Sequence, residues 1–156
     1  MSKIINPPLL AANNLSDLTS ASTARVNLGS IPFWTKVTVT YSQLATAGLT
    51  NTVSLLTLPI KGVLQDVKVS VSTVFSGGTI ATYTLSVGIA GSLLKYHPII
   101  DAKTAVILTT PAAPVSGLES VSGTTSIVLS AVSTVGNLNA ATQGSVDVWL
   151  LTSTLP

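Results

Sequence analysis

The stretch VLQDVKVSVSTVFSGGTIATYTLSVGIA, residues 63–90, contains two long runs in which apolar and polar side chains alternate. Such alternation is typical of a β-strand with one buried face. The two runs are joined by Ser76-Gly77-Gly78, and a short glycine-bearing connection between alternating runs predicts a β-hairpin. The side chains expected to be buried are Val63, Val67, Val69, Val71 and Phe75 in the first run and Ala81, Tyr83, Leu85, Val87 and Ile89 in the second.

Further strands are expected on both sides of this pair. Strand-like runs occupy residues 33–41, 52–61, 93–96, 105–109, 125–135 and 145–154. About seven or eight strands separated by turns, with no long helical period, predict an all-β chain. We expect an antiparallel β-sandwich of jelly-roll or related topology, with the strand order left open. The inward residues expected in these outer runs are Phe33, Val37, Val39, Tyr41, Leu56, Leu58, Ile60, Ile127, Leu129, Ala131, Val146, Val148 and Leu150.

The last predicted strand carries apolar residues on both faces. Asp147, Trp149 and Leu151 alternate with the predicted inward residues, so two large apolar side chains point away from the expected core. Either this strand is buried on both faces or Trp149 and Leu151 contact another subunit. We take these two residues as a candidate subunit interface.

Composition limits the classes of function. The chain has 156 residues, of which 8% are charged and 46% hydrophobic, and its net charge is +2. This length suits one domain that buries its own core. The seven basic residues are scattered along the chain, which argues against binding of DNA or RNA. A surface with few charges is instead expected where other subunits cover much of the molecule.

Targeting signals and covalent crosslinks give little information. The apolar runs are much shorter than the roughly 18 residues that a membrane-spanning helix needs, so no membrane association is expected. The first residues lack the continuous apolar run of a secretion signal, and we expect the protein to be made and assembled in the cytoplasm. The absence of cysteine excludes disulfides and thiolate metal sites.

No motif indicates catalysis. The single histidine, His97, has no cysteine and no cluster of acidic residues at metal-ligand spacing, and we expect it to be a loop residue beside Tyr96. No serine lies in a nucleophile motif, and the five acidic residues are far apart in the sequence. The chain is therefore predicted to be a non-enzyme with no metal and no cofactor.

The segment NNLSDLTSASTARVNLG, residues 13–29, differs from the rest of the chain. Asp17 or Ser20 is a suitable helix N-cap and Gly29 a suitable residue after the C-terminus, so a helix of about two turns is expected. Before it, Pro7-Pro8 favours an extended chain. We expect an N-terminal arm over residues 1–31, followed by a sandwich domain over residues 32–156. The candidate anchoring residues of the arm are Ile4, Ile5, Leu9, Leu10, Leu15, Leu18, Arg25 and Leu28.

This segment resembles one found in tail fibres and other appendage proteins of tailed bacteriophages, which has the form NNLSDL followed by an Ala-rich AR.NLG. The resemblance covers about 20 residues, and Val26 departs from it because a small polar residue is common there. It implies a virion protein and a trimer. From Trp34 onward the chain also resembles the small sandwich domains of phage decoration and fibre proteins, although no diagnostic motif marks that region. The matching residues are Asn13, Asn14, Leu15, Ser16, Asp17, Leu18, Ala24, Arg25, Asn27, Leu28 and Gly29.

Two functions follow from the resemblance and the size of the chain. The first is a structural protein on the outer surface of the virion, a homotrimeric capsid decoration or short head-fibre protein, whose arm binds the major capsid protein or another virion protein. The second is a short tail-fibre or adaptor subunit whose sandwich binds a receptor or a host surface glycan. The alternative that the arm packs on its own domain remains open.

Overall fold

The computed structural model describes residues 32–109 and 123–154. The predicted arm and its short helix lie outside these residues, so both remain predictions. The described chain forms an all-β fold with one helical turn, α2 (Tyr41–Leu44), and one 3₁₀ turn, η2 (Leu138–Ala140). The strands are β1 (Phe33–Thr40), β2 (Thr50–Leu58), β3 (Gly62–Ser76), β4 (Tyr83–Ile89), β5 (Ser92–Asp101), β6 (Val106–Thr109), β7 (Thr125–Ser133) and β8 (Gln143–Thr154).

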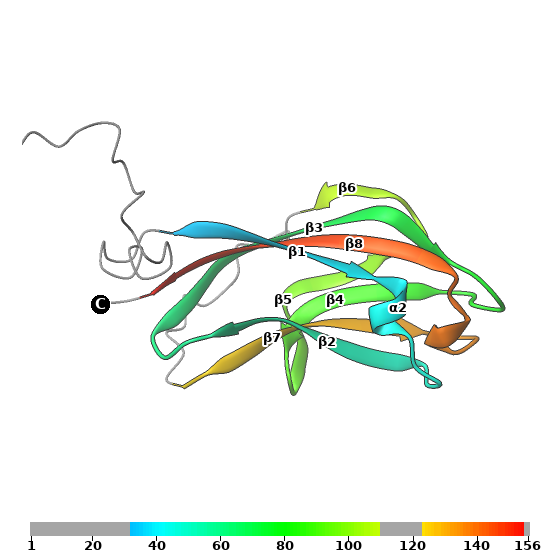
Figure 1. Ribbon diagram of the computed structural model, residues 1–156, viewed down its shortest axis with the longest axis horizontal. Coiled ribbons are helices and arrows are strands. Elements are labelled where there is room, and N and C mark those ends of the chain that lie inside the picture. Colours follow the sequence, from blue (N-terminus) through cyan, green and yellow to red (C-terminus); the bar gives the residue numbers. More distant parts are fainter. Residues whose placement is uncertain (1–31, 110–122, 155–156) are drawn as a thin grey trace, which may run out of the picture.

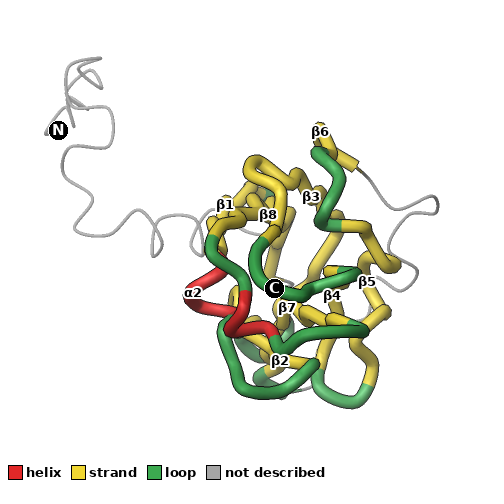
Figure 2. Tube along the Cα trace, turned by 90° about the vertical axis from the view of Figure 1, so that its right-hand side faces the viewer, coloured by secondary structure: helices red, strands yellow, loops and turns green. Residues whose placement is uncertain are grey.

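The strands form two four-stranded sheets that pack face to face (Figures 1 and 2). The order is β1-β8-β3-β6 in one sheet and β2-β7-β4-β5 in the other, and all the pairs are antiparallel. The pairing is nested: β1 with β8, β2 with β7, β3 with β6 and β4 with β5. One long hairpin rolled onto itself gives this order, which is that of a jelly roll. The prediction of a jelly-roll-like antiparallel sandwich is confirmed.

The predicted hairpin between the two central runs is wrong. β3 belongs to the first sheet and β4 to the second, and residues 77–82 cross between them. At Gly77 the connection passes very close to the backbone of Thr142: a Cβ atom on Gly77 would lie 2.5 Å from the Thr142 nitrogen, so only glycine fits there. Gly77 and Gly78 also have positive φ values, of 139° and 51°. A hairpin and a crossover of this kind have the same turn-forming residues, so local sequence does not distinguish them.

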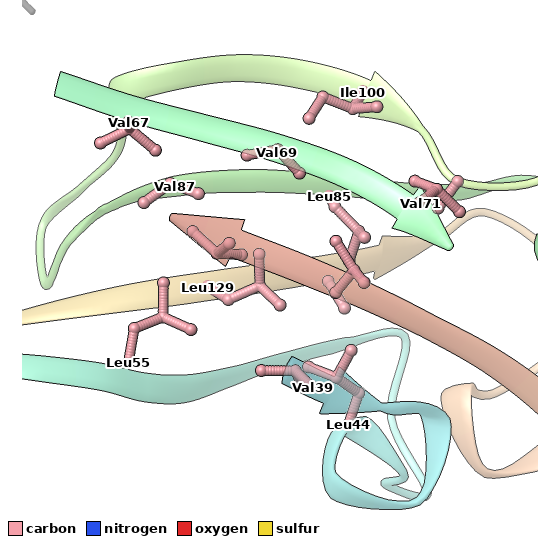
Figure 3. Packing of buried hydrophobic residues seen from close by; sticks show 14 of the residues in the cluster. Val39, Leu44, Leu55, Val67, Val69, Val71, Leu85, Val87, Ile100 and Leu129 are labelled. Atoms are coloured by element: carbon pink, nitrogen blue, oxygen red, sulfur yellow. The ribbon is translucent and has the colours of Figure 1, made fainter. Parts of the chain in front are cut away.

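The core lies between the inward faces of the two sheets. Val67, Val69 and Val71 of β3 lie opposite Leu85 and Val87 of β4 (Figure 3). The predicted alternation holds over most of both strands. Ala81 is exposed and precedes β4, Ile89 is only partly buried, and at the start of β3 Leu64 belongs to the core cluster in place of Val63. Other predicted inward residues that are buried are Val39, Leu58, Val63, Phe75, Tyr83, Ile127, Leu129, Ala131, Val146, Val148 and Leu150.

Two predictions for the run 52–61 need correction. A register irregularity between Ser54 and Leu56 changes the side that β2 presents to the core, so that Leu55 is buried there and Leu56 only partly. Ile60 lies beyond the end of β2 and is 62% exposed. A bulge of this kind inserts one residue and reverses the faces after it, which simple alternation does not reveal.

His97 lies in β5 and not in a loop. It is only 3% exposed, with Nδ1 2.9 Å from the carbonyl oxygen of Pro98 and Nε2 3.3 Å from the Thr109 hydroxyl. The Thr109 hydroxyl also lies 3.2 Å from the carbonyl oxygen of Val69. His97 therefore links β5, an edge strand of one sheet, to β6 and β3 of the other.

Candidate interaction surfaces

The two predicted interface residues lie on the outer face of the first sheet. In the strand register Leu151 pairs with Trp34 of β1, and Trp149 pairs with Lys36 of β1 and Lys68 of β3. Trp149 and Leu151 are half-buried, whereas Trp34 is 43% exposed. The structure therefore brings Trp34, Trp149 and Leu151 together, and we call these three residues the tryptophan face. Trp34 was not among the predicted interface residues, although it shares the outward alternation of Lys36.

Lysine side chains cover part of the tryptophan face. The Lys68 ammonium lies 4.7 Å from the centre of the Trp34 ring, and that of Lys36 lies 5.2 Å from the centre of the Trp149 ring. These are cation–π distances. The partial burial of Trp149 thus comes from residues of the neighbouring strands as well as from the sheet itself.

An ion pair lies beside Trp149 on this face. Lys36 Nζ lies 2.9 Å from Asp147 Oδ2, and the Thr38 hydroxyl donates to Asp147 Oδ1 at 2.6 Å. Burial by itself raises the pKa of the Asp147 carboxyl, but the Thr38 hydrogen bond and the Lys36 ammonium outweigh it, so that the pKa lies below its usual value. Asp147 therefore stays charged, and it positions Lys36 above Trp149.

A pocket of about 530 Å³ lies on the outer face of the second sheet. Its walls come from Leu93, Leu94 and Ile99 of β5, and its floor includes Ser86 of β4 and Ser130 of β7. The two serines are directly paired across these strands and are buried. We call this site the β5 pocket. Sequence reasoning missed it, because it expected only a short strand near residues 93–96.

The β5 pocket exists because β5 bulges over β4. Between the pairs Val87–His97 and Ile89–Ser92, β4 has the single residue Gly88, whereas β5 has residues 93–96. A Cβ atom on Gly88 would collide with the carbonyl oxygen of Ser92 and the backbone of Leu93. Glycine thus lets the β5 backbone cross close to β4, and the two leucines are carried over the outer face of the sheet. A glycine inside a predicted strand, here Gly88, is the sequence feature that could have indicated this bulge, and the alternation argument did not consider it.

The residues of the tryptophan face and of the β5 pocket are suited to binding another molecule through apolar contacts. None of the described residues that line the β5 pocket is charged. Within residues 32–109 and 123–154, no three His, Asp or Glu side chains come together in a way that could hold a metal ion. The predicted absence of metal, cofactor and catalysis stays a prediction. None of the helices in the described part of the chain has the length and apolar character needed to cross a membrane.

Comparison with known proteins gives only distant similarity, to solved structures. No protein-family model matches the chain, and no curated protein matches it. A solved structure described as "Cyanophage Pam1 capsid asymmetric unit" contains a similar chain, with a TM-score of 0.47 and 21% sequence identity. The match covers 82% of this chain and 87% of that chain. At this identity and TM-score the similarity says nothing about what the present chain does.

Proposed function

We propose that this chain is a non-enzymatic structural protein of a bacteriophage virion, a trimeric capsid decoration or short head-fibre protein attached by its N-terminal arm. The observation that carries the proposal is that both outer faces of the sandwich present apolar side chains. The tryptophan face lies on one sheet, and the β5 pocket with Leu94 and Ile99 lies on the other. Apolar side chains that cluster on the surface of a domain often mark a contact with another molecule, and a subunit that is contacted from both sides needs two such clusters.

The arm supports the choice of a virion. Its sequence resembles a segment of phage appendage proteins, and a helix of about two turns is too short to be stable without a surface to pack on. In the proposed arrangement the particle provides that surface for Leu15, Leu18, Arg25 and Leu28. The sandwich then forms the outward part of the subunit.

One observation favours the alternative of a short tail-fibre or adaptor subunit with a glycan-binding sandwich. An exposed tryptophan with polar neighbours is a common platform for the apolar face of a sugar ring. Trp34 is such a residue, but the Lys68 ammonium already lies over its ring. The decoration or head-fibre proposal therefore accounts for both apolar faces, whereas the glycan alternative accounts only for Trp34.

The copy number in purified virions tests the proposal. Quantitative mass spectrometry should find this chain in numbers comparable to those of the major capsid protein. A far smaller number would favour the tail alternative, and absence of the chain from virions would contradict both.

The oligomeric state provides a second test. Light scattering of the full chain should give a trimer, and Trp34→Asp should shift it toward a monomer by placing a charge on the tryptophan face. Val135→Asp is the control, because Val135 is comparably exposed, at 54%, but lies in a loop. A monomeric wild-type protein at high concentration, with or without particles, would contradict the trimer.

A further inference from the structure

The β5 pocket has the lining of a peptide site. Its walls are aliphatic, and Thr84, Ser86 and Ser130 add hydroxyl groups beneath them. Its volume of about 530 Å³ is within the range of clefts that hold a bound molecule. Since no charged side chain of the described residues lines it, a phosphate, carboxylate or ammonium ligand would lose its hydration without gaining a partner of opposite charge. An uncharged, apolar segment with a few backbone polar groups suits this lining.

We propose that the β5 pocket binds residues 4–12 of the N-terminal arm, IINPPLLAA. This inference deepens the proposed function, and it rests on it in that the arm makes the contact that the proposal assigns to this face. It moves Ile4, Ile5, Leu9 and Leu10 from the particle, where the sequence predicts them, to the sandwich. The segment contains no charged residue, and its large side chains are all aliphatic: Ile4, Ile5, Leu9 and Leu10. These match the walls formed by Leu93, Leu94 and Ile99.

The two prolines of the segment favour docking in two ways. Neither Pro7 nor Pro8 has a backbone N–H, so fewer donors must leave water when the segment enters an apolar pocket. Their restricted φ angles also limit the conformations of the free segment, which lowers the entropic cost of binding an extended chain.

The rest of the arm is long enough to make the connection. Residues 13–31 lie between this segment and the start of the sandwich, and an extended chain of that length spans about 60 Å. The two sheets of a sandwich are only about 10 Å apart, so the β5 pocket is within reach either on the same copy or on a neighbouring one. A tethered segment is present at an effective concentration on the order of millimolar, which favours it over a free partner. The proposal leaves residues 13–29 available to the particle.

The absence of cysteine from the chain makes disulfide trapping a direct test. In the full chain, Leu10→Cys combined with Leu94→Cys should form a disulfide with oxidised glutathione at least about tenfold faster than the control. The control is Leu10→Cys with Ile60→Cys, because Ile60 and Leu94 are similarly exposed, at 62% and 55%, and Ile60 does not line the pocket. Mixing the two single-cysteine variants shows whether the disulfide joins two copies. A product within one copy or between copies supports docking, and a rate equal to that of the control overturns it.

Hydrogen exchange supplies a second measurement that needs no cysteine. Leu94→Asp should accelerate amide exchange in residues 4–12 of the full chain, and Ile60→Asp should leave it unchanged. Equal exchange in wild type and both variants would overturn the proposal. A chain that fails these tests but still occurs in virions at high copy number would retain the proposed function and lose only this inference.

Discussion

The rings of Phe75 and Tyr83 stack across the core with their centres 4.5 Å apart, although they belong to different sheets. Only seven residues separate them in the chain, and these include the crossover through Gly77 and Gly78. Tyr83 is fully buried, and its hydroxyl has no hydrogen-bond partner among the described residues.

Tyr83→Phe should therefore leave stability unchanged or raise it, by about 1 kcal/mol, because it removes a buried hydroxyl with no partner and keeps the ring stack. Urea unfolding of the two proteins measures the difference. Phe75→Leu is the comparison that removes the stack and should destabilise the fold. A large loss of stability in Tyr83→Phe would mean that the hydroxyl has a partner.

Alkaline pH should destabilise the protein through the same residue. Burial raises the pKa of Tyr83 from 10.0 to about 12. The unfolded chain then loses its tyrosine proton first, so the stabilisation present below pH 10 is lost as the pH rises toward 12. The loss attributable to Tyr83 is on the order of 2 to 3 kcal/mol. Unfolding curves of wild type and Tyr83→Phe between these pH values should diverge, and parallel curves would contradict the assignment.

Acid should weaken the centre of the tryptophan face. Because the pKa of Asp147 is lowered in the folded state, its stabilisation is present above the pKa of the unfolded chain and is lost as the pH falls through the folded value. The Lys36 partner is half exposed, so the effect should be at most about 1 kcal/mol. Asp147→Asn should remove this part of the acid dependence, which thermal melts at neutral and acidic pH would detect.

Gly88→Ala should destabilise the fold by at least about 1 to 3 kcal/mol, because the new methyl group meets the backbone of Ser92 and Leu93. We expect β5 to move and the β5 pocket to change shape, which NMR shifts of Leu93 and Leu94 would report. Gly48→Ala is the control, since a Cβ atom there has only ordinary contacts. Equal stability of the two variants would show that β5 accommodates the methyl group.

His97→Ala should cost about 1 to 3 kcal/mol, because the link from β5 to Thr109 is lost and a buried side chain is removed. The sequence-based interpretation of His97 as a loop residue without a catalytic or metal role gives no reason to expect this loss of stability. Thr109→Val replaces only the hydroxyl, with a methyl group of similar size, and should show a smaller loss by the same denaturation measurement. Unchanged stability of His97→Ala would mean that the edge strands hold without this link.

The sequence by itself determined the class of the fold and most of the core. Alternation in β3, β4, β7 and β8 identified most of the buried face of each strand, because a period of two follows directly from strand geometry. It also showed that Trp149 and Leu151 point outward. These are properties of single strands, and they need no knowledge of which strands are neighbours.

Only the tertiary structure decided which strands pair, and with that the location of the candidate surfaces. The glycines after β3 allow a hairpin or a crossover equally well, and long-range pairing of β3 with β8 and of β4 with β7 selected the crossover. The pairing of β1 with β8 placed Trp34 beside Leu151, and a bulge of β5 opposite Gly88 created the β5 pocket. Register and bulges depend on contacts between residues far apart in the chain, which is why local patterns could not predict them.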